Sequence, residues 1–199
     1  MNGDHARIGP GTFVPVVGPS GAGKDTLIRL AAEAVIVDPR IRFPRRVITR
    51  TADTKSEDHD TLDEASFGRL VDTDGVALHW RAHGLGYAVP LIVDEWIAAG
   101  SVVVANLSRK AVGAAAERYC NVAVVHVTAP PDILRARIEG RGRESGADID
   151  ERLTPVPITV PDGVELIEIV NDREPDHAAE RLRRVIEKLV GEDVRQLAE

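Results

Sequence analysis

Short apolar runs alternate with amphipathic segments along the chain. The runs at 12–17, 101–107 and 122–129 are rich in valine and lack polar alternation, which is typical of buried parallel strands. Between them, apolar residues recur three and four positions apart, as in Leu27, Leu30, Ala31 and Ala34, which predicts a helix over 24–34. The same reading predicts further helices at 63–71, 93–100, 109–119, 130–140 and 175–192, and further strands at 46–49 and 165–171. This order predicts a three-layer α/β fold with a parallel sheet.

Three segments interrupt the alternation. Residues 50–90 are polar and glycine-rich and predict an inserted subdomain. Residues 140–153 are strongly charged, and the proline-rich residues 154–163 predict a surface connection. We therefore expect residues 1–199 to form a single domain, whose core comprises 12–49 and 91–190.

Composition narrows the class of protein. The chain has 199 residues, 43% of them hydrophobic, which suffices for one globular domain. The net charge of -7 argues against nucleic acid or an anionic membrane as a partner. There is no apolar run of about 20 residues and no apolar core of a signal peptide, so we expect a cytoplasmic protein. Composition does not distinguish a monomer from a homodimer.

The single cysteine, Cys120, excludes an internal disulfide, which fits a reducing compartment. It stands between a predicted helix and a predicted strand, where we expect a small buried side chain.

The segment "GPSGAGKDT" predicts a phosphate-binding loop. A predicted strand precedes it and a predicted helix follows, so backbone N–H groups and the helix N-terminus converge on one point. The glycines allow close approach to phosphate oxygens, and a lysine supplies a cation for the outer phosphates. The predicted binding residues are Gly18, Pro19, Ser20, Gly21, Ala22, Gly23, Lys24, Asp25 and Thr26.

Asp25 departs from the usual loop, in which a serine or threonine hydroxyl binds Mg²⁺ at this position. A carboxylate repels phosphates but is a strong ligand for a hard cation. We therefore predict that Asp25, or the hydroxyl of Thr26, helps to hold Mg²⁺. The alternative is that Asp25 only complements the helix dipole in the first turn.

Arginines gather in the predicted loops, namely Arg50, Arg137, Arg141, Arg143 and Arg152. Arg137 and Arg141 are four residues apart and share a helix face. Because the guanidinium fork suits phosphate oxygens, the set predicts a cationic cover for a phosphate chain. The alternative is a solvated charged face that pairs with nearby acidic residues.

The motifs "GPSGAGK", "ITR", "GLGY", "RIEGRGRES…DERL" and "IVND" occur in the order of the guanylate kinase family. The chain resembles that family from Thr12 to about Leu189. The resemblance implies a P-loop NTPase fold in which the loop binds ATP, residues 50–90 form the acceptor-binding subdomain, and residues 140–153 form a lid.

The resemblance also implies roles for individual residues. Arg50 resembles the arginine that holds the acceptor's phosphate. Arg137, Arg141 and Arg152 resemble the lid arginines that close on the transferring phosphoryl group and act in catalysis with Lys24. Asn171 of "IVND" falls where that family places its adenine pocket.

The chain departs from guanylate kinases where guanine should bind. A tyrosine before the first helix of the insertion is missing. The guanine-reading glutamate falls at His79, a base-reading serine falls near Val89, and an acidic residue falls at Asn106. A site that loses hydrogen-bonding partners for a base loses selectivity for it, so GMP is not the expected acceptor.

The motifs "GKDT", "RVITR", "SEDH", "ALHWRAHGLGY", "ANLSR" and "GRGRE" resemble a narrower group, the ribose 1,5-bisphosphate phosphokinase family of phosphonate metabolism. This resemblance implies transfer of phosphate from ATP, with Mg²⁺, to ribose 1,5-bisphosphate, giving 5-phosphoribosyl 1-diphosphate. Asp25 belongs to that family's signature. The chain has "GYAV" where that family is expected to have "YGV", so the sequence around Tyr87 departs from the family pattern.

The acceptor would bind residues of the insertion and of the following core. His83 and Arg109 are candidates for the second acceptor phosphate or the ribose hydroxyls, and Tyr87 lies in the "GLGY" motif. His79, beside Arg81, adds positive character that suits a sugar bisphosphate. The alternative for both histidines is packing on a strand surface.

Three other functions compete with this prediction. A nucleoside monophosphate kinase with altered base preference would phosphorylate GMP or another nucleotide. A catalytically silent guanylate kinase-like binding module would have lost the loop lysine or lid arginines, which are present. A gluconate-type kinase would not explain Arg50 or the 50–90 insertion.

Overall fold

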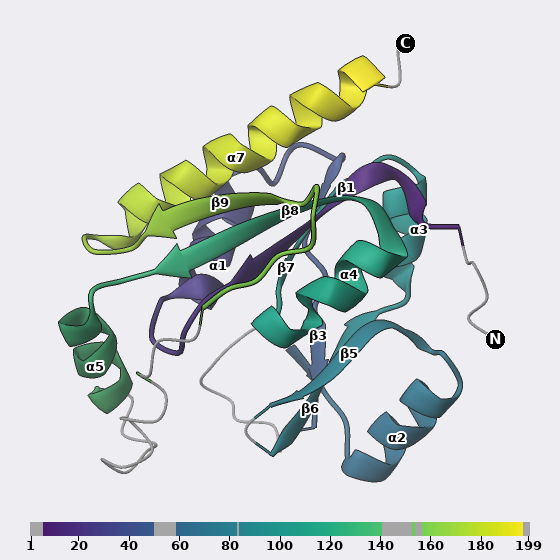
Figure 1. The fold of residues 1–199 in the computed structure, drawn as a ribbon, viewed down its shortest axis with the longest axis horizontal. Coiled ribbons are helices and arrows are strands. Elements are labelled where there is room, and N and C mark those ends of the chain that lie inside the picture. Colours follow the sequence, from purple (N-terminus) through teal and green to yellow (C-terminus); the bar gives the residue numbers. More distant parts are fainter. Residues whose placement is uncertain (1–5, 50–58, 83, 141–152, 154–156, 197–199) are drawn as a thin grey trace.

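The computed structural model describes residues 6–49, 59–82, 84–140, 153 and 157–196, with side chains described as far as residue 191. Its central sheet is parallel, as the valine-rich runs predicted (Figure 1). The strands stand in the spatial order β2 (Ile41–Arg42), β7 (Val102–Asn106), β1 (Ile8–Val17), β8 (Tyr119–Thr128) and β9 (Glu165–Val170).

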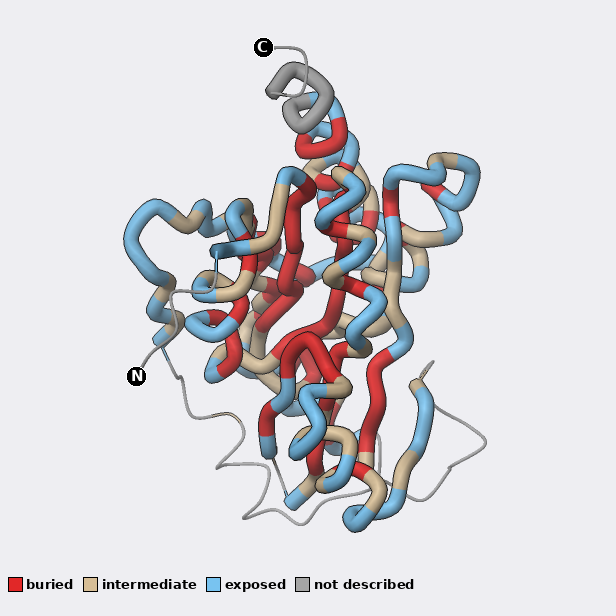
Figure 2. Tube along the Cα trace, turned by 90° about the vertical axis from the view of Figure 1, so that its right-hand side faces the viewer, coloured by how far each residue is buried: buried red, intermediate tan, exposed pale blue. Residues whose placement is uncertain are grey.

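Helices cover both faces of this sheet. They are α1 (Lys24–Ala34), α3 (Ile92–Ala98), α4 (Val112–Arg118) and α7 (Pro175–Gln196), whereas α5 (Pro131–Glu139) lies past the end of β8, against Gly21. Neighbouring residues of β1 point to opposite faces: Val14 packs with Leu27 of α1, whereas Phe13 packs with Ile97 of α3. The strands are accordingly the most buried part of the molecule, shown in red in Figure 2. The predicted three-layer α/β fold is confirmed.

A second, four-stranded sheet lies beside the first (Figure 1). Its order is β4 (His59–Thr61), β3 (Arg46–Ile48), β6 (Leu85–Pro90) and β5 (Val76–Ala82), and α2 (Glu64–Asp72) packs on it through the buried Phe67. Residues 46–49 were expected in the core, but β3 pairs with β6 and β4. The chain therefore enters the second sheet before residue 50.

The predicted helix 109–119 is found as a 3₁₀ turn, η1 (Arg109–Ala111), that continues into α4 and ends one residue early, at Arg118. Tyr119 begins β8 instead, because its ring packs on Phe13 and its hydroxyl donates to Asp94 Oδ1 at 2.9 Å. Cys120 was expected to be buried, but it is exposed, since it points away from the face that buries Tyr119.

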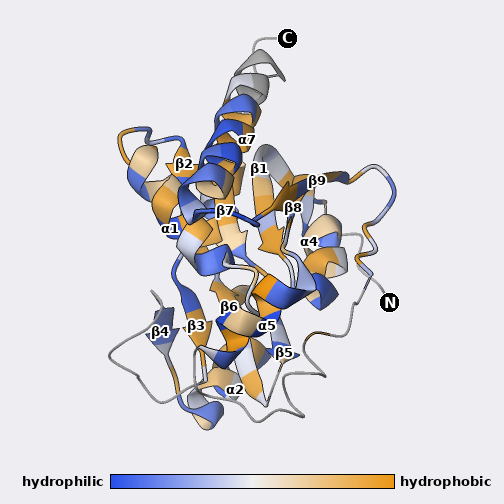
Figure 3. Cartoon of the chain, turned by 90° about the vertical axis from the view of Figure 1, so that its left-hand side faces the viewer, coloured by the Kyte–Doolittle hydropathy of each residue, from blue (hydrophilic) through white to orange (hydrophobic). Residues whose placement is uncertain are grey.

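The hydropathy of α7 follows its packing. Leu182 and Ile186 are buried against the sheet, and hydrophilic residues cover the helix's outer side (Figure 3). None of the helices described has both the length and the apolar character needed to cross a membrane.

Candidate active site

The segment 18–23 joins β1 to α1 in a turn that needs glycine. Gly18 has φ +147°, and a Cβ there would lie 2.0 Å from the carbonyl oxygen of Val127. Gly23 has φ +89°, and a Cβ there would lie 2.6 Å from Asn171 Nδ2. The glycines of the predicted loop thus let the backbone pass close to β8 and to the residue after β9.

Lys24 lies over this turn. Its Nζ donates to the carbonyl oxygens of Gly18, at 2.8 Å, and Pro19, at 3.0 Å. The ammonium group is therefore held at the N-terminus of α1, where the helix dipole adds partial positive charge. This is the arrangement of charge that binds phosphate.

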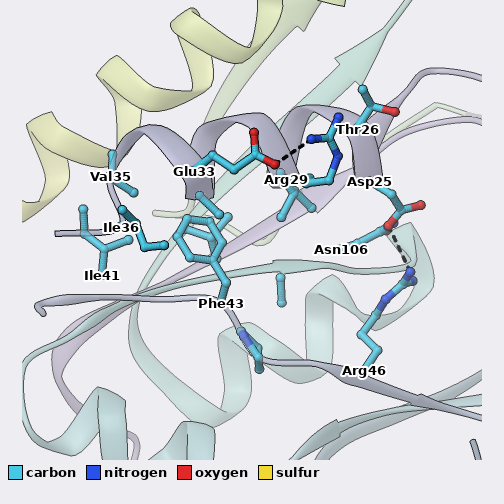
Figure 4. Close-up of a pocket in the computed structure, with 15 residues that line it drawn as sticks. Asp25, Thr26, Arg29, Glu33, Val35, Ile36, Ile41, Phe43, Arg46 and Asn106 are labelled. Carbon is cyan, nitrogen blue, oxygen red and sulfur yellow. Dashed lines mark hydrogen bonds and ion pairs between the residues drawn. The ribbon is translucent and has the colours of Figure 1, made fainter. Parts of the chain in front are cut away.

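Asp25 sits in the first turn of α1, and its Oδ1 atom accepts two hydrogen bonds. Arg46 Nη2 of β3 donates at 3.0 Å, and Asn106 Nδ2 of β7 donates at 2.6 Å (Figure 4). The Asp25 side chain is 40% exposed, whereas that of Arg46 is 10% exposed. Arg46 had not been singled out as a site residue from the sequence, which had indicated Asn106 only as a lost acidic position.

These residues fit a magnesium ion bound together with substrate. None of the described residues hydrogen-bonds the second carboxylate oxygen of Asp25, and Thr26 is exposed beside it. Oxygen ligands of this kind, completed by phosphates and water, are what Mg²⁺ uses in phosphoryl-transfer enzymes. Within the described ranges, no three acidic, histidine or cysteine side chains gather into a cage of their own.

A cavity of about 530 Å³ opens beside Asp25 (Figure 4). Its polar end carries Asp25, Arg46 and Asn106, and its other walls include Ile41, Phe43 and Val104. The cavity thus connects the start of the phosphate loop helix with the segment that leads into the second sheet.

Asn171, expected at an adenine pocket, is 2% exposed and contacts the loop. Its Nδ2 donates to the carbonyl oxygen of Ala22 at 2.8 Å, and its backbone N–H donates to Thr128 at 2.7 Å. Arg137 Nη1 of α5 donates to the backbone oxygen of Asn171 at 3.1 Å. The structure therefore brings Asn171 and Arg137 together behind the loop, and a role for either in binding ATP stays a prediction.

The expected acceptor residues that the structure describes lie on three elements, β5, β6 and η1. His79 is exposed on β5, and Tyr87 of β6 stacks on Trp80 with 5.4 Å between the ring centroids. Arg109 is half-buried at the start of η1, and this burial lowers the pKa of its guanidinium.

His126 of β8 was not predicted as a site residue. Burial is the main cause that lowers the pKa of its imidazole; the carboxylate of Glu168, 3.8 Å from Nδ1, opposes this, and the charges of Arg109 and Lys24 reinforce it. The charges of Arg109 and Lys24 thus lower the pKa of the same histidine. In the sequence, His126 stands inside a run of valines. The only indication of a role is that a polar residue interrupts a strand predicted to be buried.

Several predicted residues lie outside the described ranges. These are Arg50, His83, Arg141, Arg143 and Arg152, with nearly all of the expected lid at 140–153. Their roles stay predictions.

No family model matches the chain. Individual proteins, however, are similar to the chain over most of its length. The ribose 1,5-bisphosphate phosphokinase PhnN of Methylobacterium radiotolerans is 48% identical over 173 residues, which are 87% of this chain and 96% of that protein. The protein of the same name from Bradyrhizobium diazoefficiens is 44% identical over 186 residues, 92% of each chain. The bifunctional ribose 1,5-bisphosphokinase-thymidine phosphorylase of Azorhizobium caulinodans is 42% identical over 96% of this chain but only 27% of its own length.

Among solved structures, a guanylate kinase from Anaplasma phagocytophilum is similar, with a TM-score of 0.64 and 19% identity over 92% of this chain and 86% of that one. This likeness shows the guanylate kinase-like fold. The identities of 48% and 44% over nearly the whole of both relatives show the narrower group. The chain belongs to the ribose 1,5-bisphosphate phosphokinase family.

Proposed function

We propose that this protein transfers the γ-phosphoryl group of ATP to ribose 1,5-bisphosphate, giving 5-phosphoribosyl 1-diphosphate and ADP. The observation that carries the proposal is the 48% identity to a ribose 1,5-bisphosphate phosphokinase over 96% of that protein. The loop supports it, because Lys24 and the glycines that a phosphate loop requires are present and in place.

This phosphoryl transfer requires no strong general base. An oxygen of the acceptor's 1-phosphate, already ionised at neutral pH, attacks the γ-phosphorus of ATP. A new P–O bond forms, the bond between the γ-phosphorus and the β–γ bridging oxygen breaks, and ADP leaves with that electron pair. Catalysis then consists of positioning the two anions and neutralising their charge.

On the ATP side, the backbone of 18–23 and the ammonium of Lys24 would hold the β- and γ-phosphates. Asp25 and Thr26 would hold Mg²⁺, which would supply positive charge that offsets the charge of the outer phosphates. Arg137, Arg141 and Arg152 would neutralise the phosphoryl group in transfer, as the family resemblance implies. Asn171 fixes the loop from behind through Ala22.

On the acceptor side, Arg50 would grip one phosphate. Arg109, whose guanidinium is partly desolvated, is suited to the other, because a desolvated cation attracts an anion more strongly than a hydrated one. His79, His83 and Tyr87 would contact the ribose or its phosphates from the second sheet.

The proposal is tested by ADP release in a coupled assay with ATP and Mg²⁺. Ribose 1,5-bisphosphate, GMP, gluconate and no acceptor run in parallel. We expect turnover with the sugar bisphosphate only, lost in Lys24→Ala and kept in Lys188→Ala, which removes an exposed lysine of α7. Turnover with GMP would instead support a nucleoside monophosphate kinase. ATP binding without turnover of any acceptor would support a binding module.

A further inference from the structure

The carboxylate of Asp25 presents an electrostatic problem inside this loop. It is attached one residue after Lys24, at the place where the phosphates of ATP are expected. An uncompensated carboxylate there would repel the phosphates and cancel much of the positive charge of the lysine.

The structure holds a compensating group. Arg46 Nη2 lies 3.0 Å from Asp25 Oδ1, and Asn106 Nδ2 lies 2.6 Å from the same atom. Two donors on one oxygen fix the direction of the carboxylate, and the guanidinium adds a full positive charge. Asp25 and both partners line the same cavity (Figure 4).

The burial of Arg46 distinguishes this contact from an ion pair between two exposed side chains. The Arg46 side chain is 10% exposed, so its charge has lost most of its water and depends on protein partners. The neighbouring Arg45 differs: its side chain is 55% exposed, and it pairs with Asp60 of the second sheet at 3.3 Å. Arg45 therefore faces solvent, whereas Arg46 faces the first turn of α1.

We propose that Arg46, assisted by Asn106, is a positioning residue that neutralises Asp25 and turns its Oδ1 away from the nucleotide. The loop then binds the phosphates of ATP before a cation arrives, and the second carboxylate oxygen stays available to the cation. The inference rests on the proposed function only as far as ATP binding, and not on the identity of the acceptor.

The proposal also gives the second sheet a part in ATP binding. Arg46 belongs to β3, which pairs with β6 of that sheet, whereas Asp25 begins the helix after the loop. One residue of the sheet expected to bind the acceptor therefore tunes the charge of the ATP site.

A double-mutant cycle on ATP affinity tests this. We would measure ATP binding by calorimetry in EDTA for wild type, Arg46→Gln, Asp25→Asn and the double variant, with Arg45→Gln as the matched loss of one arginine. Arg46→Gln is expected to weaken ATP binding by about tenfold or more, since it leaves Asp25 uncompensated. In the Asp25→Asn background the same change should cost about threefold or less. Arg45→Gln should bind ATP as the wild type does.

Saturating Mg²⁺ supplies a second readout. A cation beside Asp25 takes over the neutralisation, so the affinity of Arg46→Gln for ATP should recover most of its loss when Mg²⁺ is present. A residue that only supported the fold would not produce a loss that depends on both Asp25 and the cation.

An equal loss of ATP affinity from Arg46→Gln in the wild-type and Asp25→Asn backgrounds would overturn the proposal. An unchanged ATP affinity together with a raised KM for the sugar bisphosphate would also overturn it, and would assign Arg46 to the acceptor. If Arg46→Gln does not fold, Arg46→Met takes its place, because it keeps an apolar stem at this buried position and removes the charge and the donor to Oδ1. The same cycle against Asp25→Asn then decides. Because ATP binding is read without an acceptor, a failed phosphorylation assay would leave these outcomes distinct.

Discussion

Asn171 offers a change of a few atoms with a large expected effect. Asn171→Asp replaces the Nδ2 donor by an oxygen and leaves the shape of the side chain almost unchanged. The donor lies 2.8 Å from the carbonyl oxygen of Ala22, and the residue is 2% exposed. The substitution therefore places an acceptor against an acceptor, with no water to relieve the contact.

The cost follows from the lost hydrogen bond and the buried charge. Leaving a buried carbonyl without its donor costs about 1–3 kcal/mol. Burying an ionised carboxylate costs more, unless the group takes up a proton instead. A total of about 2–4 kcal/mol at neutral pH would lower Tm by roughly 5–15 °C in a chain of this length.

The pH dependence identifies the cause. Burial and the facing carbonyl raise the pKa of the introduced carboxyl in the folded state above its unfolded value of about 3.9. A group with a raised folded pKa contributes its stability at low pH and loses it as pH rises through that pKa. Asn171→Asp should therefore lie closest to the wild type near pH 5 and fall furthest below it near pH 8.

Thermal unfolding at pH 5, 6.5 and 8 measures this difference, with Asp172→Asn, an exposed neighbour, as control for a change of one carboxylate. A loss of Tm that is the same at all three values would refute the argument, as would a loss below about 1 °C, which corresponds to less than about 0.5 kcal/mol. ATP affinity should fall as well. The carbonyl of Ala22 and the N–H of Gly23 belong to one trans peptide, so loss of the hydrogen bond to the oxygen also loosens an N–H of the predicted phosphate-binding loop.

Three further expectations follow from the described contacts. Gly18→Ala should destabilise the protein by about 3 kcal/mol or more, because its Cβ would lie 2.0 Å from the Val127 carbonyl at φ +147°. Gly113→Ala in α4, where a Cβ meets nothing within 4 Å, should be neutral or stabilising by up to about 1 kcal/mol. Urea unfolding measures the stability of both variants, and an equal loss of stability in the two would contradict the argument. His126 has a folded pKa below its unfolded value of about 6.5, so it favours the folded state above that value and disfavours it as pH falls towards the folded pKa. His126→Gln should therefore reduce the loss of urea stability between pH 7.5 and pH 5.5, and an unchanged difference would show that other groups cause it.

Local patterns predicted the elements better than their pairing. Helix 24–34 agrees with α1 because its apolar residues have a clear helical period, and the strand 101–107 contains β7 because it is a continuous apolar run with clear ends. The strand at 46–49 was also recognised, but its sheet was not. The three buried residues of β3 do not indicate by their sequence whether this strand pairs with β2 in the central sheet or with β6, which follows about 40 residues later.

The site shows the same limit. The glycines and Lys24 were predicted because their function depends on consecutive residues. The contact of Asp25 with Asn106 joins residues 81 positions apart, and its contact with Arg46 joins residues 21 positions apart. Either partner could have faced solvent, as Arg45 does, since strand alternation sets which of two adjacent residues points inward.

The positions where guanylate kinases read guanine bear on the acceptor. Val89 is fully buried at 0% exposure in β6, so it is not available to contact any ligand. Asn106 is 8% exposed, and its Nδ2 donates to Asp25. This hydrogen bond holds the side chain against the first turn of α1. His79 is exposed on β5, but an imidazole there lacks the two acceptor oxygens of a carboxylate. A purine base would therefore meet no hydrogen-bonding side chain at Val89, and at Asn106 it would meet an amide whose Nδ2 already donates to Asp25. A sugar bisphosphate requires none at these positions, because its recognition depends on cations that neutralise phosphate. The arrangement therefore supports a sugar phosphate acceptor over a nucleotide, independently of the relatives' names.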